Sequence, residues 1–377
     1  LFSRGFIKTG LGKRIAYNLI AAFGSSSLRL AYALALSDLI LAPATPSNTA
    51  RVGGVIMPIT TSLAKAFGSE PQDGPRKIGS FLMQSIYQVN TITSAMFQTS
   101  MAGNTLVAAL ALESFGIGIT WGDWAMAAIV PGIIALIVMP YFIYKVYPPE
   151  IKDAREAQQM IREELKGLGK MSFQEWVMLG VFVLALVLWA TSQFTKIDAT
   201  TVAFLGISIL LATSVLVWDD VKSEKGAWDT LVWMGTLMGF AGFLSKLGFI
   251  KWATVLVGGY IPEGSWIIAF VIAVLINTYS HYVFASLTAH ISAMFVAFSA
   301  IAISAGAPPM LTLLMIAFTS NLCMSLTHYA AGPSPVIFNT GYVPQNTWWK
   351  LGFFTSVINL IIFMGLGSVW MKAIGMW

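Results

Sequence analysis

Long apolar runs constrain the fold of this chain more than any other feature of its sequence. Crossing the hydrocarbon core of a bilayer takes roughly 20 predominantly apolar residues in a helix. Runs close to this length recur at 124–146, 176–191, 200–218 and 353–370. Only 10% of the residues are charged and 56% are hydrophobic, which leaves too few polar side chains to cover a soluble surface. The sequence therefore predicts an all-α polytopic membrane protein.

The charged residues gather in one segment of the chain. Six of the 22 Lys and Arg residues lie within 145–170, where five Asp and Glu residues are mixed with them. This mixture is typical of a solvated amphipathic linker, not of the basic, aromatic-studded patch that binds nucleic acid. Because Lys and Arg are retained on the cytoplasmic side, we expect 148–175 to be a cytoplasmic linker between two halves, 1–147 and 176–377.

The two halves contain an internal repeat. The segment 2–8 (FSRGFIK) resembles 244–251 (LSKLGFIK), and each is followed by an apolar run and then by a Ser-x-Thr-Ala tetrapeptide, at Ser47 and at Ser286. Counting membrane crossings along the chain places the two tetrapeptides on segments that enter from opposite faces. The sequence thus predicts two inverted-topology repeats, an architecture shared by many secondary transporters.

Each tetrapeptide interrupts an apolar stretch. Such a break leaves backbone amides without helical partners, and each costs roughly several kcal/mol in hydrocarbon unless protein or water satisfies it. We therefore expect re-entrant helical hairpins at 30–67 and 265–305, whose tips offer hydroxyls and helix N-terminal amides to an anion. The tip residues expected to bind substrate are Ser47, Asn48, Thr49, Ser286 and Thr288.

A second interruption follows each hairpin. The run 78–112 is broken at 99–105, and the run 309–338 is broken at 325–335, so both are predicted to be transmembrane helices with unwound centres. The unwound backbone is expected at Gly103, Gly332 and Pro333. Three polar side chains beside it either hydrogen-bond the substrate or cap the broken helices: Asn104, Thr327 and Ser334.

Two basic residues occupy equivalent repeat positions, Arg51 and His290, each two residues beyond the Thr of its tip. A guanidinium near the bilayer midplane costs about 2.5 to 3.5 kcal/mol on insertion scales, so Arg51 should face a cavity and find an anionic partner. If substrate is that partner, the empty carrier holds an uncompensated charge and returns slowly, which predicts exchange. Alternatively, Arg51 snorkels to the interface, and His290 is a neutral, hydrogen-bonded core residue.

These residues resemble the divalent anion:sodium symporters, in particular their dicarboxylate exchanger branch. The resemblance rests on Ser47-Asn48-Thr49, on Ser286-Leu287-Thr288, on 325–329 (SLTHY) and on the ending 348–377, and it extends over essentially the whole chain. It implies a scaffold domain that dimerises and a transport domain that moves as an elevator. It also implies about three further helices before residue 1.

The chain departs from the sodium-coupled members of that family at the second tip. In those relatives both tips carry Ser-Asn-Thr, whose oxygens help to hold sodium, whereas Leu287 offers no side-chain oxygen here. Exchanger relatives place basic side chains where sodium would sit. The resemblance therefore implies that Arg51 and His290 substitute for the two cations, with no metal bound.

The predicted function is sodium-independent exchange of C4 or C5 dicarboxylates, with tricarboxylates as possible further substrates and no cofactor. The alternative is a sodium-coupled symporter of dicarboxylate, citrate or sulfate. A channel fits two inverted copies less well, and catalytic motifs such as His-Glu-x-x-His are absent from the sequence, which argues against an enzyme. The expected location is a bacterial inner membrane or a plastid inner envelope.

Two residue types have no predicted role in binding. The single Cys323 cannot form an internal disulfide and is predicted to be a small core residue. Several Trp residues are predicted to be interfacial anchors: Trp121, Trp124, Trp348 and Trp349.

Overall fold

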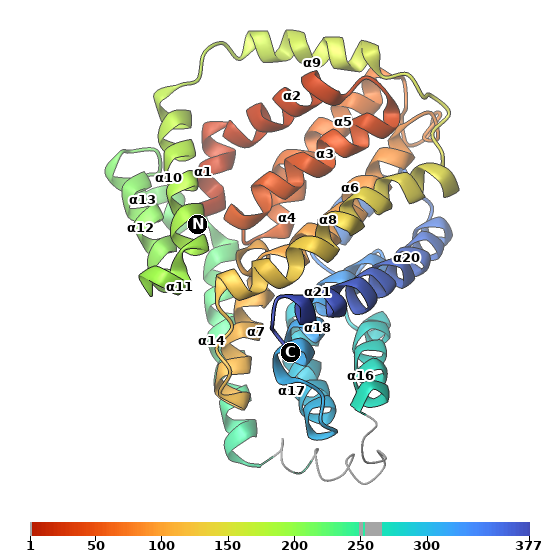
Figure 1. The fold of residues 1–377 in the computed structure, drawn as a ribbon. Helices are drawn as coiled ribbons and strands as arrows, with labels where there is room; N and C mark the ends of the chain where they lie inside the picture. The colour runs from red at the N-terminus through yellow and green to blue at the C-terminus, as the bar shows by residue number, and fades with distance from the viewer. Residues whose placement is uncertain (1, 249–251, 253–265) are drawn as a thin grey trace.

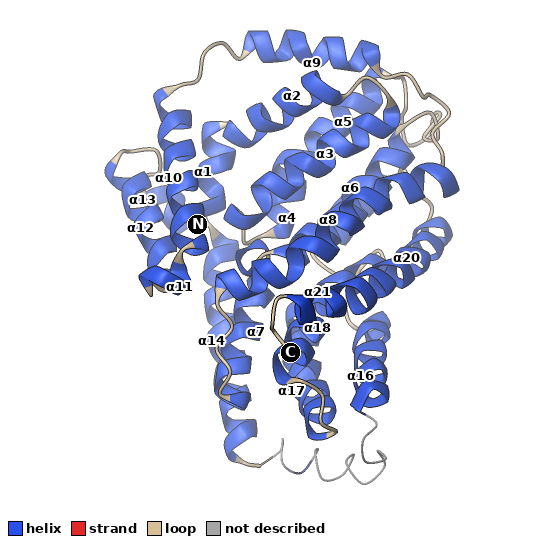
Figure 2. Ribbon diagram, in the orientation of Figure 1, coloured by secondary structure: helices blue, strands red, loops and turns tan. Residues whose placement is uncertain are grey.

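The computed structural model describes residues 2–248, 252 and 266–377. In these residues the regular secondary structure is helical, as Figure 2 shows, and the only extended pairing is one isolated bridge between Ser26 and Asp153. Seven helices among the described residues are long and apolar enough to cross a membrane. The prediction of an all-α polytopic membrane protein is confirmed.

The seven candidate spans lie in both halves of the chain. They are Ser27–Ala44, Trp121–Val146, Phe173–Ala190, Trp266–Val283, Leu287–Ser304, Pro309–Leu326 and Gln345–Ala373. The predicted run 200–218 is wrong at its C-terminal end, because α12 (Ala199–Ala212) stops at a turn in which Ser214 has a φ of 57°. A left-handed residue cannot continue an α-helix, and the chain restarts in α13 (Trp218–Ser223).

The first half begins with α1 (Phe2–Thr9) and α2 (Leu11–Phe23). Then follows a helix, a break and a second helix over the region predicted as the hairpin 30–67. Its parts are α3 (Ser27–Leu41), the 3-10 turn η1 (Ala42–Ala44), α4 (Asn48–Arg51), the π turn η2 (Val52–Ile56) and α5 (Met57–Ala66). The Ser26 side chain accepts from the Arg29 amide and so caps α3.

The predicted broken helix 78–112 is interrupted slightly earlier than expected. It consists of α6 (Gly79–Met96), η3 (Gln98–Ser100) and α7 (Ala102–Phe115). Phe97 and Met101 have extended backbones on either side of η3, so the unwound centre starts two residues before the predicted Thr99. The next helix, α8 (Trp121–Val146), starts at a capping box formed by Thr120 and Asp123.

The second half shows the same order of elements. Helix α16 (Trp266–Ser280), η4 (His281–Val283), a short break and α17 (Leu287–Ser304) are followed by α18 (Pro309–Leu322), η5 (Cys323–Leu326) and α19 (Pro333–Phe338). The chain ends in α20 (Gln345–Leu360), the π turn η6 (Ile361–Gly367) and α21 (Ser368–Ala373). Residues 249–251, the end of the segment predicted to repeat 2–8, lie outside the described residues.

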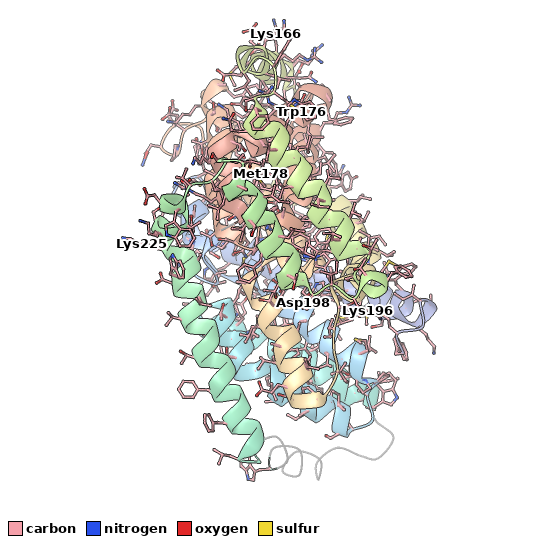
Figure 3. The ribbon with its side chains drawn as sticks, turned by 90° about the vertical axis from the view of Figure 1, so that its left-hand side faces the viewer. Lys166, Trp176, Met178, Lys196, Asp198 and Lys225 are labelled. Carbon is pink, nitrogen blue, oxygen red and sulfur yellow. The ribbon has the colours of Figure 1, made fainter. Side chains whose placement is uncertain are left out.

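A peripheral group of helices lies to one side of the broken elements. The predicted linker forms α9 (Arg155–Gly167), which crosses above α2 in Figure 1, and the Gln158 amide donates to the Ala21 carbonyl oxygen there at 2.9 Å. Helices α10 (Phe173–Ala190) and α12 pack side by side, joined by the short α11 (Ser192–Thr195), while α14 (Lys225–Lys246) runs apart from them (Figure 3).

The centre of the molecule is polar for a membrane protein. Every residue of α6 is buried, including Gln84, Gln88 and Asn90, and α6 packs against α18, which is buried from Leu311 to its end. The tryptophan prediction is wrong for three residues. Trp121, Trp124 and Trp348 are buried, and Trp124 Nε1 donates to the Ala95 carbonyl oxygen at 2.8 Å. Their indole rings fill the core instead of marking an interface.

Candidate functional site

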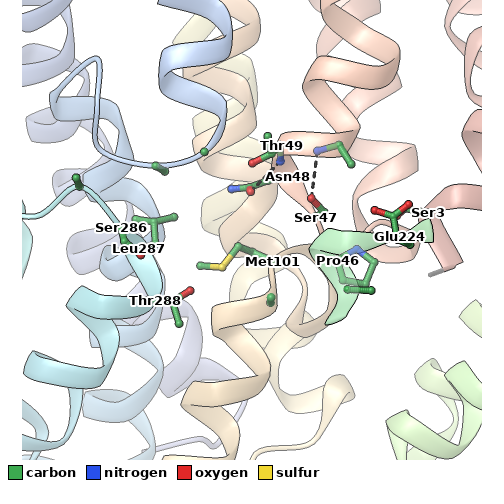
Figure 4. Close-up of a pocket in the computed structure, with 16 residues that line it drawn as sticks. Ser3, Pro46, Ser47, Asn48, Thr49, Met101, Glu224, Ser286, Leu287 and Thr288 are labelled. Atoms are coloured by element: carbon green, nitrogen blue, oxygen red, sulfur yellow. Dashed lines mark hydrogen bonds between the residues drawn. The ribbon is translucent and has the colours of Figure 1, made fainter. Parts of the chain in front are cut away.

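One cavity of about 420 Å³ brings the two predicted tips together. Figure 4 shows Ser47, Asn48 and Thr49 on one side of it and Ser286, Leu287 and Thr288 on the other, with Met101 between them. All five tip residues proposed from the sequence line this pocket. The remaining lining residues are Ser3, Pro46, Ala50, Ala102, Glu224, Ala227, Ala285, Ala331 and Gly332.

The two tips have the same local construction. Ser47 accepts from the Ala50 amide at 3.1 Å, and Ser286 accepts from the Ala289 amide at 3.3 Å, so each serine is the N-cap of the helix that follows. The first helical backbone bond is also equivalent, since Arg51 N to Ser47 O and His290 N to Ser286 O both measure 3.0 Å. Ser47 and Ser286 have extended backbones, and the helix N-terminus that follows each cap is a favourable place for an anion.

Two glycines allow close packing around the tips. A Cβ on Gly332 would overlap the Thr49 hydroxyl, so only glycine lets the second broken helix approach the first tip. A Cβ on Gly103 would lie 2.7 Å from Ile291 Cδ1, which ties the first broken helix to the second hairpin in the same way. Pro333 follows as the first residue of α19, where its missing N–H costs no hydrogen bond.

Arg51 lies behind the first tip and does not line the pocket. Its side chain is fully buried, and its Nε is 2.9 Å from Asp38 Oδ1. Its terminal nitrogens donate to two carbonyl oxygens and two hydroxyls: Thr45 O, Ser100 O, Thr93 Oγ1 and Ser94 Oγ. The expectation that Arg51 is uncompensated in the empty carrier is therefore wrong, and so is the alternative that it snorkels to the interface.

His290 is buried behind the second tip and does not line the pocket either. Its Nε2 lies 3.0 Å from the Ser280 hydroxyl, and its ring meets the His281 ring edge to face at 4.8 Å. The described salt bridges include no partner for it. Neither basic residue thus faces the pocket, although both stand directly behind the tips that do.

The three other predicted polar residues do not line the pocket. Asn104 is saturated by Ser94 O, Phe97 O and the Asn321 amide, so it caps the break between α6 and α7. The Ser334 hydroxyl is 2.8 Å from Tyr87 Oη, and the Thr327 carbonyl accepts from the same phenol at 3.2 Å. These contacts match the capping alternative for Asn104 and Ser334, whereas the buried Thr327 hydroxyl has no hydrogen-bond partner among the described residues. The Tyr87 phenol bridges backbone and side-chain groups of the second break.

Among the residues that the structure describes, Glu224 is the only charged side chain that lines the pocket. It lies with Ser3 at the side of the first tip, where α13 and α14 join (Figure 4). The sequence prediction included neither this carboxylate nor Asp38. An unpaired carboxylate or guanidinium inside a membrane has a high free-energy cost. The presence of Asp38 and Arg51 in one predicted hairpin could therefore have predicted an ion pair between them.

The pocket lining offers hydroxyls, the Asn48 amide, helix N-terminal backbone and the Glu224 carboxylate. These features define a multi-pass membrane protein that holds a polar pocket between two interrupted helical hairpins. Residues 1–377 match the sodium:sulfate symporter transmembrane region, and the chain belongs to that transporter family.

Relatives within this family match the chain from end to end. The "Putative malate transporter YflS" of Bacillus subtilis is 51% identical over 376 residues, which is 100% of this chain and 79% of the relative. The "Dicarboxylate transporter 1, chloroplastic" of Spinacia oleracea is 47% identical over 100% of this chain and 67% of its own length. The "Inner membrane protein YbhI" of Escherichia coli is 42% identical over 100% and 79%.

Proposed function

We propose that this protein carries small dianions with two carboxylates, of the malate, succinate and 2-oxoglutarate class, across a membrane. The observation that carries the proposal is the single pocket into which both serine-capped tips converge. Two groups of amides and hydroxyls on opposite walls suit two carboxylates of one substrate. The names of two relatives, a putative malate transporter and a dicarboxylate transporter, support the same substrate class.

Sodium-independent exchange is the proposed mode of transport. Arg51 is surrounded by the Asp38 carboxylate, carbonyl oxygens and hydroxyls, a set of ligands that would equally suit a small hard cation. We infer that its guanidinium fills the first cation position permanently. The empty pocket then offers tip hydroxyls and helix N-termini without a bound anion, in place of a free charge, and the lost interaction makes return without substrate slow.

A sodium-coupled symporter is the second candidate, and the second tip is the observation that favours it. Behind that tip His290 has a hydroxyl and an aromatic neighbourhood, with no counter-charge among the described ion pairs. If the ring is neutral, no fixed cation substitutes for sodium there. Leu287 supports exchange in turn, because its side chain offers no oxygen ligand to sodium.

The remaining architecture is proposed from the repeated order of elements. We infer that the two halves are inverted copies, that the hairpins and broken helices move together as an elevator, and that the protein forms a homodimer. The exposed apolar side chains along α14 are consistent with a lipid or subunit contact on the peripheral side. They are Leu231, Val232, Phe240 and Phe243.

Counterflow into proteoliposomes tests the proposed function. Vesicles are preloaded with succinate, malate, citrate or buffer, and uptake of labelled succinate is measured with sodium or with choline outside. Exchange predicts uptake that requires a dicarboxylate inside and does not change with sodium. Uptake into buffer-loaded vesicles that scales with the sodium gradient would support the symporter instead.

A further inference from the structure

Three buried side chains with metal-binding atoms meet behind the second tip. They are His281 in η4, His290 in α17 and Cys323 in η5, all with no exposed surface. One ring nitrogen of each histidine and the Cys323 sulfur lie within 4.8 Å of one another. None of the three lines the substrate pocket, so binding of the dianion does not account for them.

The hydrogen bonds of His281 determine which of its ring nitrogens is free. Its Nε2 is 2.8 Å from the Ala330 carbonyl oxygen. Since a carbonyl can only accept, Nε2 must carry the proton, and Nδ1 of the neutral ring keeps its lone pair. That Nδ1 is buried and has no hydrogen-bond partner. A histidine held through one nitrogen by a carbonyl is the usual arrangement of a metal ligand.

His290 has the same arrangement through a hydroxyl. The Ser280 hydroxyl donates to the Asn277 carbonyl oxygen at 3.0 Å, so it is left to accept from His290 Nε2, also at 3.0 Å. The His290 Nδ1 therefore carries a lone pair as well, and it too is buried without a partner. Two orphaned acceptors and one thiol in a single cluster require a common explanation.

We propose that His281, His290 and Cys323 form a binding site for a zinc-class d10 metal ion. Imidazole and thiolate are the donors that Zn²⁺ and Cu⁺ prefer, whereas sodium, magnesium and calcium prefer oxygen. In a tetrahedral site with Zn–N near 2.0–2.1 Å and Zn–S near 2.3 Å, ligand atoms lie about 3.3–3.6 Å from one another. The three atoms lie within 4.8 Å of one another and therefore need to approach by up to about 1.5 Å on binding. On binding, the Cys323 S–H bond breaks, an S–metal bond forms and one proton leaves to solvent.

The position of the site indicates what metal would do. His281 lies at the end of the first arm of the second hairpin, and His290 lies in the first turn after the tip of the same hairpin. Cys323 lies in the second broken helix. Ala330, which holds His281, directly precedes two residues of the pocket lining, Ala331 and Gly332. A bound ion would therefore link the tip to the broken helix and inhibit movement of the tip. This consequence for transport rests on the proposed function, but metal binding does not.

Cobalt spectroscopy on the purified full chain tests binding directly. Titration with Co²⁺ is expected to give a visible spectrum with a thiolate charge-transfer band, one ion per chain, displaced by Zn²⁺. Cys323→Ser keeps a donor for the Ser320 carbonyl, which Sγ now contacts at 3.3 Å, but removes the soft ligand and with it the band. His281→Gln should weaken Co²⁺ binding by more than about 100-fold, since changing a supporting residue alone costs 10- to 100-fold.

The chain supplies a matched control, because His328 is its third and last histidine and bonds the Trp349 indole at 3.0 Å. His328→Gln should bind Co²⁺ like the parent protein. Absence of a thiolate band in the parent, or equal binding by the parent and Cys323→Ser, overturns the proposal. A parallel titration with Cu⁺ under reducing conditions distinguishes the two ions, and tighter Cu⁺ than Zn²⁺ binding assigns the site to copper.

Transport gives the second readout. Micromolar-range Zn²⁺ is expected to inhibit succinate counterflow by the parent protein and by His328→Gln, with relief by a chelator. Cys323→Ser should exchange succinate at the parent rate and resist Zn²⁺. Equal inhibition of Cys323→Ser would contradict the inhibitory role. If no variant transports dicarboxylates, the proposed function fails, while the cobalt spectrum still decides the metal site.

Discussion

Behind its tip the first hairpin holds an ion pair, Arg51 with Asp38, and at the equivalent position the second holds the His290 cluster without a described ion pair. The pocket-facing parts of the two tips are nevertheless alike, with a serine cap and a threonine two residues later. The pocket lining is thus similar at the two tips, and the support behind it is not. The difference teaches that a charge behind a tip is tolerated only when its counter-charge is folded in with it.

This comparison also changes where the attraction for an anion comes from. Arg51 is neutralised by Asp38, so neither tip presents a free positive charge to the pocket, and Glu224 contributes a negative one. On the proposed function, hydroxyls and helix N-termini at the two tips then bind the dianion. We expect such a site to distinguish substrates by the spacing of their carboxylates more than by total charge.

Removing Arg51 should have the largest effect. Arg51→Ala leaves the Asp38 carboxylate buried and unpaired, which costs about 3–5 kcal/mol, and the thermal unfolding temperature in detergent should fall sharply. The matched control is Arg51→Gln with Asp38→Asn, which removes both charges together and should recover much of that loss. A single variant as stable as the double variant would show that the pair is not coupled.

Filling the contact between Gly332 and Thr49 is expected to have the next largest effect. Gly332→Ala introduces a methyl group that overlaps the Thr49 hydroxyl, and overpacking of this kind costs about 1–3 kcal/mol. Succinate binding measured by calorimetry should weaken at least about tenfold. Gly180→Ala on α10, where a Cβ meets nothing within 4 Å, is the control and should bind as the parent does. Equal succinate affinities of Gly332→Ala and the parent protein would show that the contact between Gly332 and Thr49 does not affect substrate binding.

Replacing His290 tests the other side of the comparison. His290→Gln keeps a donor for Ser280 and leaves no counter-ion exposed, so its cost in stability should stay near 1 kcal/mol. The unfolding temperature should therefore fall much less than for Arg51→Gln alone. A comparable fall for both variants would indicate a charged His290 with an anionic partner.

An exposed ion pair gives the smallest expected effect and a reference for the buried one. The hydrogen bond from the Lys8 ammonium lowers the pKa of Asp220 below its ordinary value of 3.8. Its stabilising contribution is therefore complete above pH 3.8 and is lost as the pH falls through the folded value. Asp220→Asn should cost at most about 1 kcal/mol at neutral pH. Unfolding temperatures at pH 7 and pH 3 should differ less for this variant than for the parent.

The breaks were predictable from sequence because they are local. Polar tetrapeptides at Ser47 and Ser286 cannot continue an apolar helix in hydrocarbon without partners, and both are N-caps in the structure. The convergence of the tips in one pocket was expected from the predicted repeat. By contrast, the break in the first broken helix was predicted too late in the sequence. It starts at Phe97, whose side chain is apolar and gives no signal that its backbone is extended.

Tertiary partners were harder to predict. Arg51 was expected to meet substrate, but Asp38, 13 residues earlier, satisfies it. Asn104 and Ser334 have polar side chains that could bind a carboxylate. They are instead hydrogen-bonded to Ser94, Phe97 and Tyr87. The wrong assignment of Trp124 has the same origin, because its indole finds a carbonyl within the core. Residue type states what a side chain can bind, and only packing decides what reaches it.

The affinity of succinate for matched tip variants is the measurement that tests joint binding by the two hairpins most directly. Thr49→Val and Thr288→Val each remove one pocket hydroxyl without changing side-chain shape, and Thr105→Val on exposed α7 surface is the control. Calorimetry is expected to show a dissociation constant about 5- to 10-fold higher for each tip variant and unchanged for the control. If only one tip variant weakens binding, or neither does, the two tips do not share the dianion.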